Sequence, residues 1–254
     1  MLKTLETQSA ALADSAVLPM ASRAETPGSP PPTSEDAGED SPDSLFEQFA
    51  RLYIFCREKL FRDDTERMVN ALWPGRNPRD GEKLIELGCG PGFYSSKLAA
   101  RFPQVSVVGV DRSPSQLNWA RQKRNALGLK NCRFQSDNVL KLSHPDDSFD
   151  ALIASRLFTV LPNRRCAVAE MYRVLRPGGR CFIAEPRWAF WASIPLYAMW
   201  LVALLTHFHN GYREPTHARV LSTLDMKRLF ETQPWRKIET WCEGRYQYAL
   251  CEKG

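Results

Sequence analysis

Short apolar runs alternate with amphipathic stretches along the central part of the chain. An apolar run of about four to eight residues predicts a buried strand, whereas apolar residues three or four positions apart predict a helix. The predicted strands are Lys83–Leu87, Val105–Val110, Cys132–Ser136, Phe149–Ala154 and Arg180–Ala184. The predicted helices between them are Phe93–Arg101, Pro114–Leu127 and Asn163–Leu175. Strands that alternate with helices in this way indicate crossover units and a parallel sheet.

The same patterns predict further elements at both ends of this region. The added helices are residues 45–61 behind the capping-box sequence Ser44-Leu45-Phe46-Glu47, then Asp64–Leu72 and Ser222–Glu231. The added strands are Lys237–Cys242 and Arg245–Cys251. Because only Glu243 and Gly244 separate these two strands, they predict an antiparallel hairpin. We therefore expect one folded domain over residues 44–254, built on an α/β sheet of seven strands.

Residues 1–43 differ in composition from the rest of the chain. Residues 1–44 hold two basic and eight acidic side chains, which gives a net charge of −6, and all 27 aromatic residues lie after Leu45. An acidic segment rich in Pro and Ser cannot bury enough apolar surface to offset the entropy lost on ordering. We therefore predict that residues 1–43 are a disordered tail.

The remaining 210 residues carry 32 basic and 21 acidic side chains, a net charge of +11. Such an excess fits an anionic partner, either a nucleic acid or a lipid surface. The seven cysteines include no C-x-x-C pair, which indicates neither a disulfide framework nor a zinc ribbon. Reduced cysteines are typical of the cytoplasm, where we expect this protein to reside.

Residues 187–220 form an insertion between the fifth predicted strand and the helix Ser222–Glu231. Its first part, Trp188–Thr206, has 19 residues without a charged side chain, which is long enough to cross a membrane. Pro195 interrupts this run, and the hairpin after it has to return to the sheet, so we predict a helical lid instead of a span. Two interpretations of the lid stay open. Its apolar face packs on the core, or it also enters the inner membrane surface or lines an apolar substrate pocket.

The most informative segment joins the first predicted strand to the helix that follows. It reads Glu86-Leu87-Gly88-Cys89-Gly90-Pro91-Gly92, so three alternate glycines follow a buried strand. Glycine permits a sharp turn and the close approach of a ligand, and the N-terminus of a helix attracts an anion. The second strand runs into Asp111, the position from which an acid accepts hydrogen bonds from ribose hydroxyls. The third runs into Asp137-Asn138, where a carboxylate can accept from the exocyclic amine of adenine.

Together with Phe149-Asp150 and Leu175-Arg176-Pro177-Gly178-Gly179, these motifs resemble the class I S-adenosylmethionine-dependent methyltransferases. The nearest likeness is to the ubiquinone and menaquinone biosynthesis group, over roughly residues 82–186. The resemblance implies a Rossmann-like, doubly wound α/β fold with a C-terminal antiparallel hairpin, and S-adenosyl-L-methionine as the cofactor. It also implies methyl transfer by in-line displacement to a small acceptor, which the uncharged insertion suggests is apolar or amphipathic.

The resemblance further implies roles for single residues. The expected cofactor-binding residues are Glu86, Gly88, Gly90, Gly92, Asp111, Arg112, Asp137, Asn138 and Ser155. In this scheme the glycines admit the methionine part of the cofactor, Asp111 binds the ribose hydroxyls, and Arg112 lies beside the adenine. Asp137 accepts from the adenine amine, and Ser155 lies near the methionine carboxylate or the sulfonium. The alternative is that Glu86 only caps a turn and that Asp137 only begins one.

Residues for the acceptor are expected mainly in the insertion, because it should return over the cofactor. The candidates for a general base are His207, His209 and Tyr212. The candidates for acceptor binding are Tyr53, Tyr94, Arg187, Trp191, Arg213 and His217. It is equally open that these are ordinary packing or surface residues. No metal site is predicted, because the spacing of the histidines is not that of a ligand set.

Other functions are less well supported by the sequence. After the fourth strand the chain reads Ala154-Ser155-Arg156-Leu157, where methyltransferases acting on nucleic acid bases carry Asn/Asp-Pro-Pro-Tyr. No basic run with interleaved aromatic residues is present, so nucleic acid is not expected as a substrate. Two alternatives stay open: a nicotinamide-dependent oxidoreductase, and a catalytically silent cofactor-binding module. The missing G-x-G-x-x-G pattern counts against the first and the intact glycine loop against the second.

Overall fold

The computed structural model describes residues 62–75, 77–188 and 220–254. The helices are α3 (Thr65–Leu72), α4 (Phe93–Arg101), α5 (Pro114–Ala126), α6 (Arg164–Val174) and α8 (Thr223–Phe230). The strands are β1 (Lys83–Leu87), β2 (Ser106–Asp111), β3 (Cys132–Ser136), β4 (Phe149–Ser155), β5 (Leu175–Pro186), β6 (Trp235–Glu243) and β7 (Tyr246–Lys253). The predictions of an acidic tail, a first helix and a helical lid concern residues that lie, wholly or mostly, outside these ranges.

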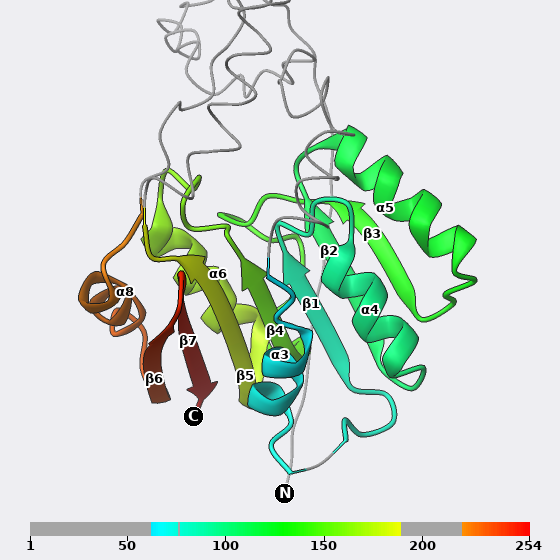
Figure 1. Ribbon diagram of the computed structural model, residues 1–254. Helices are drawn as coiled ribbons and strands as arrows, with labels where there is room; N and C mark the ends of the chain where they lie inside the picture. Colours follow the sequence, from blue (N-terminus) through cyan, green and yellow to red (C-terminus); the bar gives the residue numbers. More distant parts are fainter. Residues whose placement is uncertain (1–61, 76, 189–219) are drawn as a thin grey trace, which may run out of the picture. The chain divides into compact units, whose positions relative to one another are not determined.

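The strands of the described residues form one sheet in the order β3-β2-β1-β4-β5-β7-β6 (Figure 1). The first five of these strands are parallel, whereas β7 runs antiparallel to β5 and β6 antiparallel to β7. This arrangement confirms the doubly wound α/β fold and the C-terminal hairpin. Because the strand order reverses between β1 and β4, a ligand is expected beyond the carboxyl ends of these two strands.

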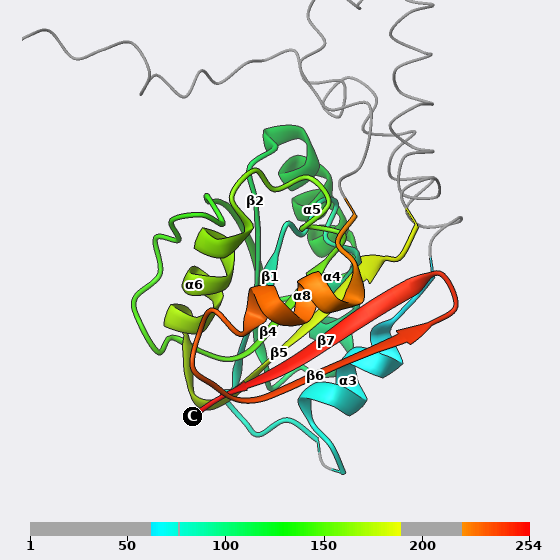
Figure 2. The same cartoon turned by 90° about the vertical axis from the view of Figure 1, so that its left-hand side faces the viewer.

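Helices cover both faces of the sheet, with α3, α4 and α5 on one face and α6 and α8 on the other (Figures 1 and 2). Successive residues of a strand point to opposite faces, so both faces need apolar side chains. In β1, Leu84 packs in the cluster with α3, α4 and α5, while Ile85 packs in the cluster with α6 and α8. This two-sided burial explains why the central strands β1, β2 and β4 are mostly apolar.

Strand β5 is longer than the predicted segment Arg180–Ala184. Leu175 already pairs with Phe149 of β4, and regular pairing resumes where Ala151 faces Arg180. The residues between these two pairs bulge out of the ladder. Pro and Gly in this bulge are also typical of a turn, which is why the sequence pattern placed a loop here.

One side chain holds together the two chain segments that flank residues 189–219. Gln247 of β7 is buried, and its Nε2 donates hydrogen bonds to the carbonyl oxygens of Pro186 at 3.4 Å and Leu221 at 2.7 Å. Its Oε1 accepts from the hydroxyl of Thr223 at 3.1 Å. The end of β5 and the start of α8 therefore meet at one point beside β7.

Candidate functional site

The glycine loop between β1 and α4 has a backbone that favours glycine at three positions. Gly88, Gly90 and Gly92 have φ angles of 65°, 51° and 72°, in the left-handed region. Gly92 also lacks space for a side chain, because a Cβ there would lie 2.5 Å from Cζ of Phe134. At Gly90 the nearest atom to such a Cβ is Oε1 of Gln116, at 3.7 Å. The loop is thus a tight turn packed on one side and roomier around Gly90.

Asp111, at the end of β2, is hydrogen-bonded to this loop. Its Oδ2 accepts from the backbone N–H of Gly90 at 2.7 Å, and its Oδ1 accepts from that of Ser113 at 3.0 Å. Burial raises the pKa of the Asp111 carboxyl, and these backbone donors oppose the rise. A carboxylate has about four acceptor positions, so Asp111 can also accept from hydroxyl groups of a ligand above the loop. Arg112 is exposed beside it.

Glu86 lies under the loop and is only 3% exposed. Its Oε2 accepts hydrogen bonds from the backbone N–H of Ser95, at 2.8 Å, and from the Ser95 hydroxyl. Ser95 belongs to the first turn of α4, whose N-cap, Gly92, has no side chain to cap it. A carboxylate is favoured at this end of a helix. Glu86 thus fixes the start of α4 against β1, and its part in cofactor binding stays a prediction.

Asp137 organises the loop that follows β3. Its Oδ1 accepts from the backbone N–H of Asn138 at 2.8 Å, and its Oδ2 accepts from the backbone N–H of Ser143 at 3.1 Å and the Ser143 hydroxyl at 2.9 Å. Nδ1 of His144 lies 3.3 Å from Oδ2. Burial lowers the pKa of His144, and the Asp137 carboxylate opposes this change. This geometry is that of the turn alternative, and adenine contacts by Asp137 and Asn138 stay a prediction.

Strands β4 and β5 are parallel to β1, so their carboxyl ends lie at the same end of the sheet as the glycine loop. Ser155 is half-buried and pairs with Ala184, and the next residue, Arg156, has a φ of 56°. A left-handed residue other than glycine is uncommon and is a feature of functional sites. The buried Glu185 accepts a hydrogen bond from the backbone N–H of Phe158 at 2.9 Å. Burial raises the pKa of Glu185 to about 7.

Two of the expected acceptor-binding residues lie within the described ranges. Tyr94 is buried, and its hydroxyl donates to the carbonyl of Arg62 at 3.3 Å and accepts from the N–H of Asp64 at 3.4 Å, so it ties α4 to the segment before α3. Arg187 is exposed beside the hairpin turn, where its Nη1 donates to the carbonyl of Gly244 at 3.4 Å. Their roles in acceptor binding stay predictions. The remaining candidates, Tyr53, Trp191, His207, His209, Tyr212, Arg213 and His217, lie outside the described residues.

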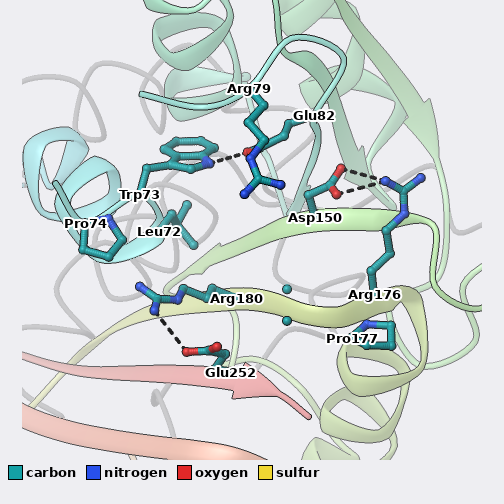
Figure 3. Close-up of a pocket in the computed structure, with 12 residues that line it drawn as sticks. Leu72, Trp73, Pro74, Arg79, Glu82, Asp150, Arg176, Pro177, Arg180 and Glu252 are labelled. Carbon is teal, nitrogen blue, oxygen red and sulfur yellow. Dashed lines mark hydrogen bonds and ion pairs between the residues drawn. The ribbon is translucent and has the colours of Figure 1, made fainter. Parts of the chain in front are cut away.

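A cavity of about 350 Å³ lies at the opposite end of the sheet (Figure 3). It is lined by Glu82 before β1, Asp150 near the start of β4, the bulge of β5, and Glu252. Arg176 pairs with Asp150 at 2.9 Å and Arg180 with Glu252 at 3.0 Å, as Figure 3 shows. Ligands of open α/β sheets bind beyond the carboxyl ends of the strands. This cavity, at their amino ends, is therefore not the cofactor site that the motifs predict.

Two buried polar residues near the predicted site were not singled out from the sequence. Glu185 follows the predicted strand Arg180–Ala184 just as Asp111 follows the predicted strand Val105–Val110, so the same signal could have identified Glu185. Gln116 is 3% exposed, and neither Nε2 nor Oε1 of its side chain has a hydrogen-bond partner within the part of the chain that the structure describes. Gln116 could have been found from its spacing, because it lies one helical turn before Ala120, a buried residue on the same face of α5.

Three features of this structure are typical of a nucleotide-binding α/β domain. They are the reversal of strand order in the parallel sheet, the glycine loop after the first strand, and the acid at the end of the second strand. The family of this domain follows from comparison with known proteins. A family profile described as "Methyltransferase domain" matches residues 78–238. The chain belongs to this methyltransferase domain family.

Curated relatives include two demethylmenaquinone methyltransferases. The protein from Deinococcus radiodurans is 39% identical over 103 residues, which cover 41% of this chain and 42% of the relative. The protein from Thermus thermophilus is 37% identical over 134 residues, which cover 51% of this chain and 60% of the relative. The chain thus spans about half the length of the curated relatives it matches.

Solved structures share the fold. A putative S-adenosyl-L-methionine-dependent methyltransferase from Methanococcus maripaludis has a TM-score of 0.60 at 17% identity, covering 82% of this chain and 94% of its own. Geranyl diphosphate C-methyltransferase from Streptomyces coelicolor, solved with S-adenosyl-L-homocysteine, has a TM-score of 0.55 at 17% identity, with 75% of each chain covered. At these identities the likeness establishes the Rossmann-like architecture.

Proposed function

We propose that the chain is an S-adenosyl-L-methionine-dependent methyltransferase that acts on a small molecule. The observation that carries this proposal is the hydrogen bond between Gly90 and Asp111, which joins the glycine loop to the acid at the end of β2 in a chain of the methyltransferase family. Methyltransferases named for demethylmenaquinone and trans-aconitate are among its relatives, which supports a small-molecule acceptor.

The residues of this chain fit the cofactor. Side chains at Gly88 and Gly92 would meet Leu157 and Phe134 within 3 Å, so these glycines keep the turn tight, and the room for a ligand lies around Gly90. Asp111 would accept from the ribose hydroxyls, and Glu86 would hold the loop in place by capping α4. When bound, the cofactor supplies an activated methyl group on its sulfonium.

The protein's part in the reaction is then to position the acceptor and exclude water. A nucleophile held in line with the methyl group gains most of its rate from orientation. A general base is needed only if the nucleophile arrives protonated. We propose His207, His209 and Tyr212 for that proton, on the basis of their position after the uncharged run in the sequence.

We propose an apolar or amphipathic acceptor, reached beside a membrane surface on the cytoplasmic face. The uncharged run Trp188–Thr206 and the net charge of +11 outside the tail support this. None of the helices in the described ranges combines the length and apolar character that crossing a bilayer requires. Flotation with anionic and with neutral liposomes tests the membrane part: recovery of the protein in the soluble fraction with both would refute it.

Calorimetric titration with S-adenosyl-L-homocysteine tests the cofactor site. The Asp111→Ala substitution removes the charged acceptor and should weaken binding by about 10- to 100-fold, the equivalent of about 1.5–3 kcal/mol. Asp80→Ala is the matched control, because Asp80 is exposed and its side chain makes no hydrogen bond or ion pair within the described residues. Equal affinities for the two variants, or no binding by the unmodified protein, would refute the assignment.

The acceptor class is tested by transfer of a radiolabelled methyl group from S-adenosyl-L-methionine. Purified protein is incubated with the apolar and the aqueous fractions of a cell extract, and each product is partitioned into organic solvent. Label that enters only the organic phase supports an apolar or amphipathic acceptor. Label that stays in water-soluble products would refute this acceptor class while leaving methyl transfer itself established.

A further inference from the structure

Gln116 is a buried polar side chain that has nothing to bond to in the described part of the chain. It lies in the first turn of α5, where its backbone N–H donates to the hydroxyl of Ser113, the N-cap. Its side chain is 3% exposed, but neither the Nε2 group nor the Oε1 atom has a hydrogen-bond partner within the described residues. A glutamine amide offers two donors and an oxygen with two lone pairs, so both of its functions are unmet.

Such a group is costly and therefore informative. Buried polar atoms in folded proteins are nearly always hydrogen-bonded, and an exception points to a missing partner. Leucine or methionine fills a similar volume without this cost, and the neighbouring Leu117 and Ala120 show that this face of α5 is otherwise apolar. The side chain is thus suited to a partner that the protein itself does not supply.

The position of the amide indicates which part of a ligand it would meet. Oε1 of Gln116 lies 3.7 Å from the position of a Cβ built on Gly90, in the roomier part of the glycine loop. The backbone N–H of Gly90 is bonded to Asp111, the acid proposed to hold the ribose. Gln116 and Asp111 therefore both meet the loop at Gly90, next to the expected nucleoside.

We propose that Gln116 is a cofactor-binding residue whose amide hydrogen-bonds to the adenosyl part of S-adenosyl-L-methionine. This inference rests on the proposed function. A neutral amide that both donates and accepts matches a nucleoside, whose hydroxyls do both, whose ring nitrogens accept and whose exocyclic amine donates. The amino and carboxylate groups of the methionine part each carry a full charge, for which a charged partner or a helix N-terminus is better suited.

The Gln116→Met substitution tests this role because it keeps the volume and removes the amide. We expect S-adenosyl-L-homocysteine to bind 10- to 100-fold more weakly, and 5′-methylthioadenosine, which lacks the amino acid part, to lose affinity by about the same factor. The Tm of the ligand-free protein should stay the same or rise, because an unpaired amide has been removed from the interior. Gln233→Met is the matched control, since that residue lies before β6, away from the glycine loop.

Each other outcome decides against the proposal. Equal binding of S-adenosyl-L-homocysteine by the variant and the unmodified protein would refute the role of Gln116 and leave the proposed function intact. A loss confined to S-adenosyl-L-homocysteine would place the amide at the methionine part instead. A ligand-free Tm lowered by more than about 5 °C in both Gln116→Met and Gln116→Leu would make the amide structural. Absence of binding by the unmodified protein would refute the proposed function together with this inference.

Discussion

Glu185 gives the protein a stability that depends on pH in a direction unusual for an acid. It is 2% exposed, and burial raises the pKa of its carboxyl from an ordinary value of 4.5 to about 7. The backbone N–H of Phe158 and the nearby Arg156 and Arg164 oppose this rise without cancelling it. The folded protein therefore holds the Glu185 proton more tightly than the unfolded chain does.

The sign of the effect follows from this difference. The stabilisation is fully present below about pH 4.5 and is lost as the pH rises through about 7. The difference between the two pKa values corresponds to about 3 kcal/mol of unfolding free energy. Glu185→Gln removes the titration but keeps an oxygen that can accept from the N–H of Phe158. Relative to the unmodified protein, the variant should thus be about 3 kcal/mol more stable at pH 8.5 than at pH 4.5.

Urea denaturation of both proteins at the two pH values measures this quantity. The comparison cancels every other group that titrates in the same way in both proteins. Glu231→Gln serves as the control, because it makes the same substitution at the exposed C-cap residue of α8, where an ion pair contributes at most about 1 kcal/mol. If the difference between the unmodified protein and Glu185→Gln is the same at pH 4.5 and pH 8.5, Glu185 does not titrate as argued and the reasoning fails.

Three further substitutions test single contacts of the fold by chemical denaturation. Gly92→Ala should lower the free energy of unfolding by about 2–5 kcal/mol, because it combines a left-handed φ with a clash against Phe134. Gly90→Ala should lower it by only about 1–2 kcal/mol, because it has the left-handed φ without the clash. Equal losses for the two variants would contradict the clash. Tyr248→Phe removes a hydroxyl that donates to the buried carboxylate of Asp64 at 2.9 Å and should cost about 1–3 kcal/mol. An unchanged denaturation midpoint for this variant would show that the hydrogen bond contributes nothing.

The architecture of the sheet could be predicted from local patterns because the central parallel strands β1, β2 and β4 are buried on both faces. Lys83–Leu87 is an apolar run that needs no information from elsewhere in the chain, and its boundaries agree with β1. The bulge in β5 is different. Pro177 and Gly178 fit a turn and a bulge equally well, and the choice depends on the pairing of Leu175 with Phe149 on another strand.

The candidate site also combines features that the local sequence determines with features that depend on contacts between elements. The need for glycine at Gly88, Gly90 and Gly92 is a property of the backbone and can be predicted from the order of the residues. The hydrogen-bond partner of a side chain cannot be predicted in this way. Asp137 bonds to Ser143 in this structure, and Gln116 is buried because α5 packs beneath the glycine loop. Both facts depend on contacts between elements that spacing along the chain does not specify.

The amide of Gln247 has a consequence for how this domain can evolve. Since it fastens Pro186 and Leu221 to β7, both junctions of the insertion are held against the sheet. A change in the length of such a connection carries only a slow logarithmic cost, about 0.6 kcal/mol for each doubling. The segment that we expect to choose the acceptor can therefore be lengthened, shortened or exchanged between lineages, while the cofactor loop and the strands beneath it are inherited unchanged.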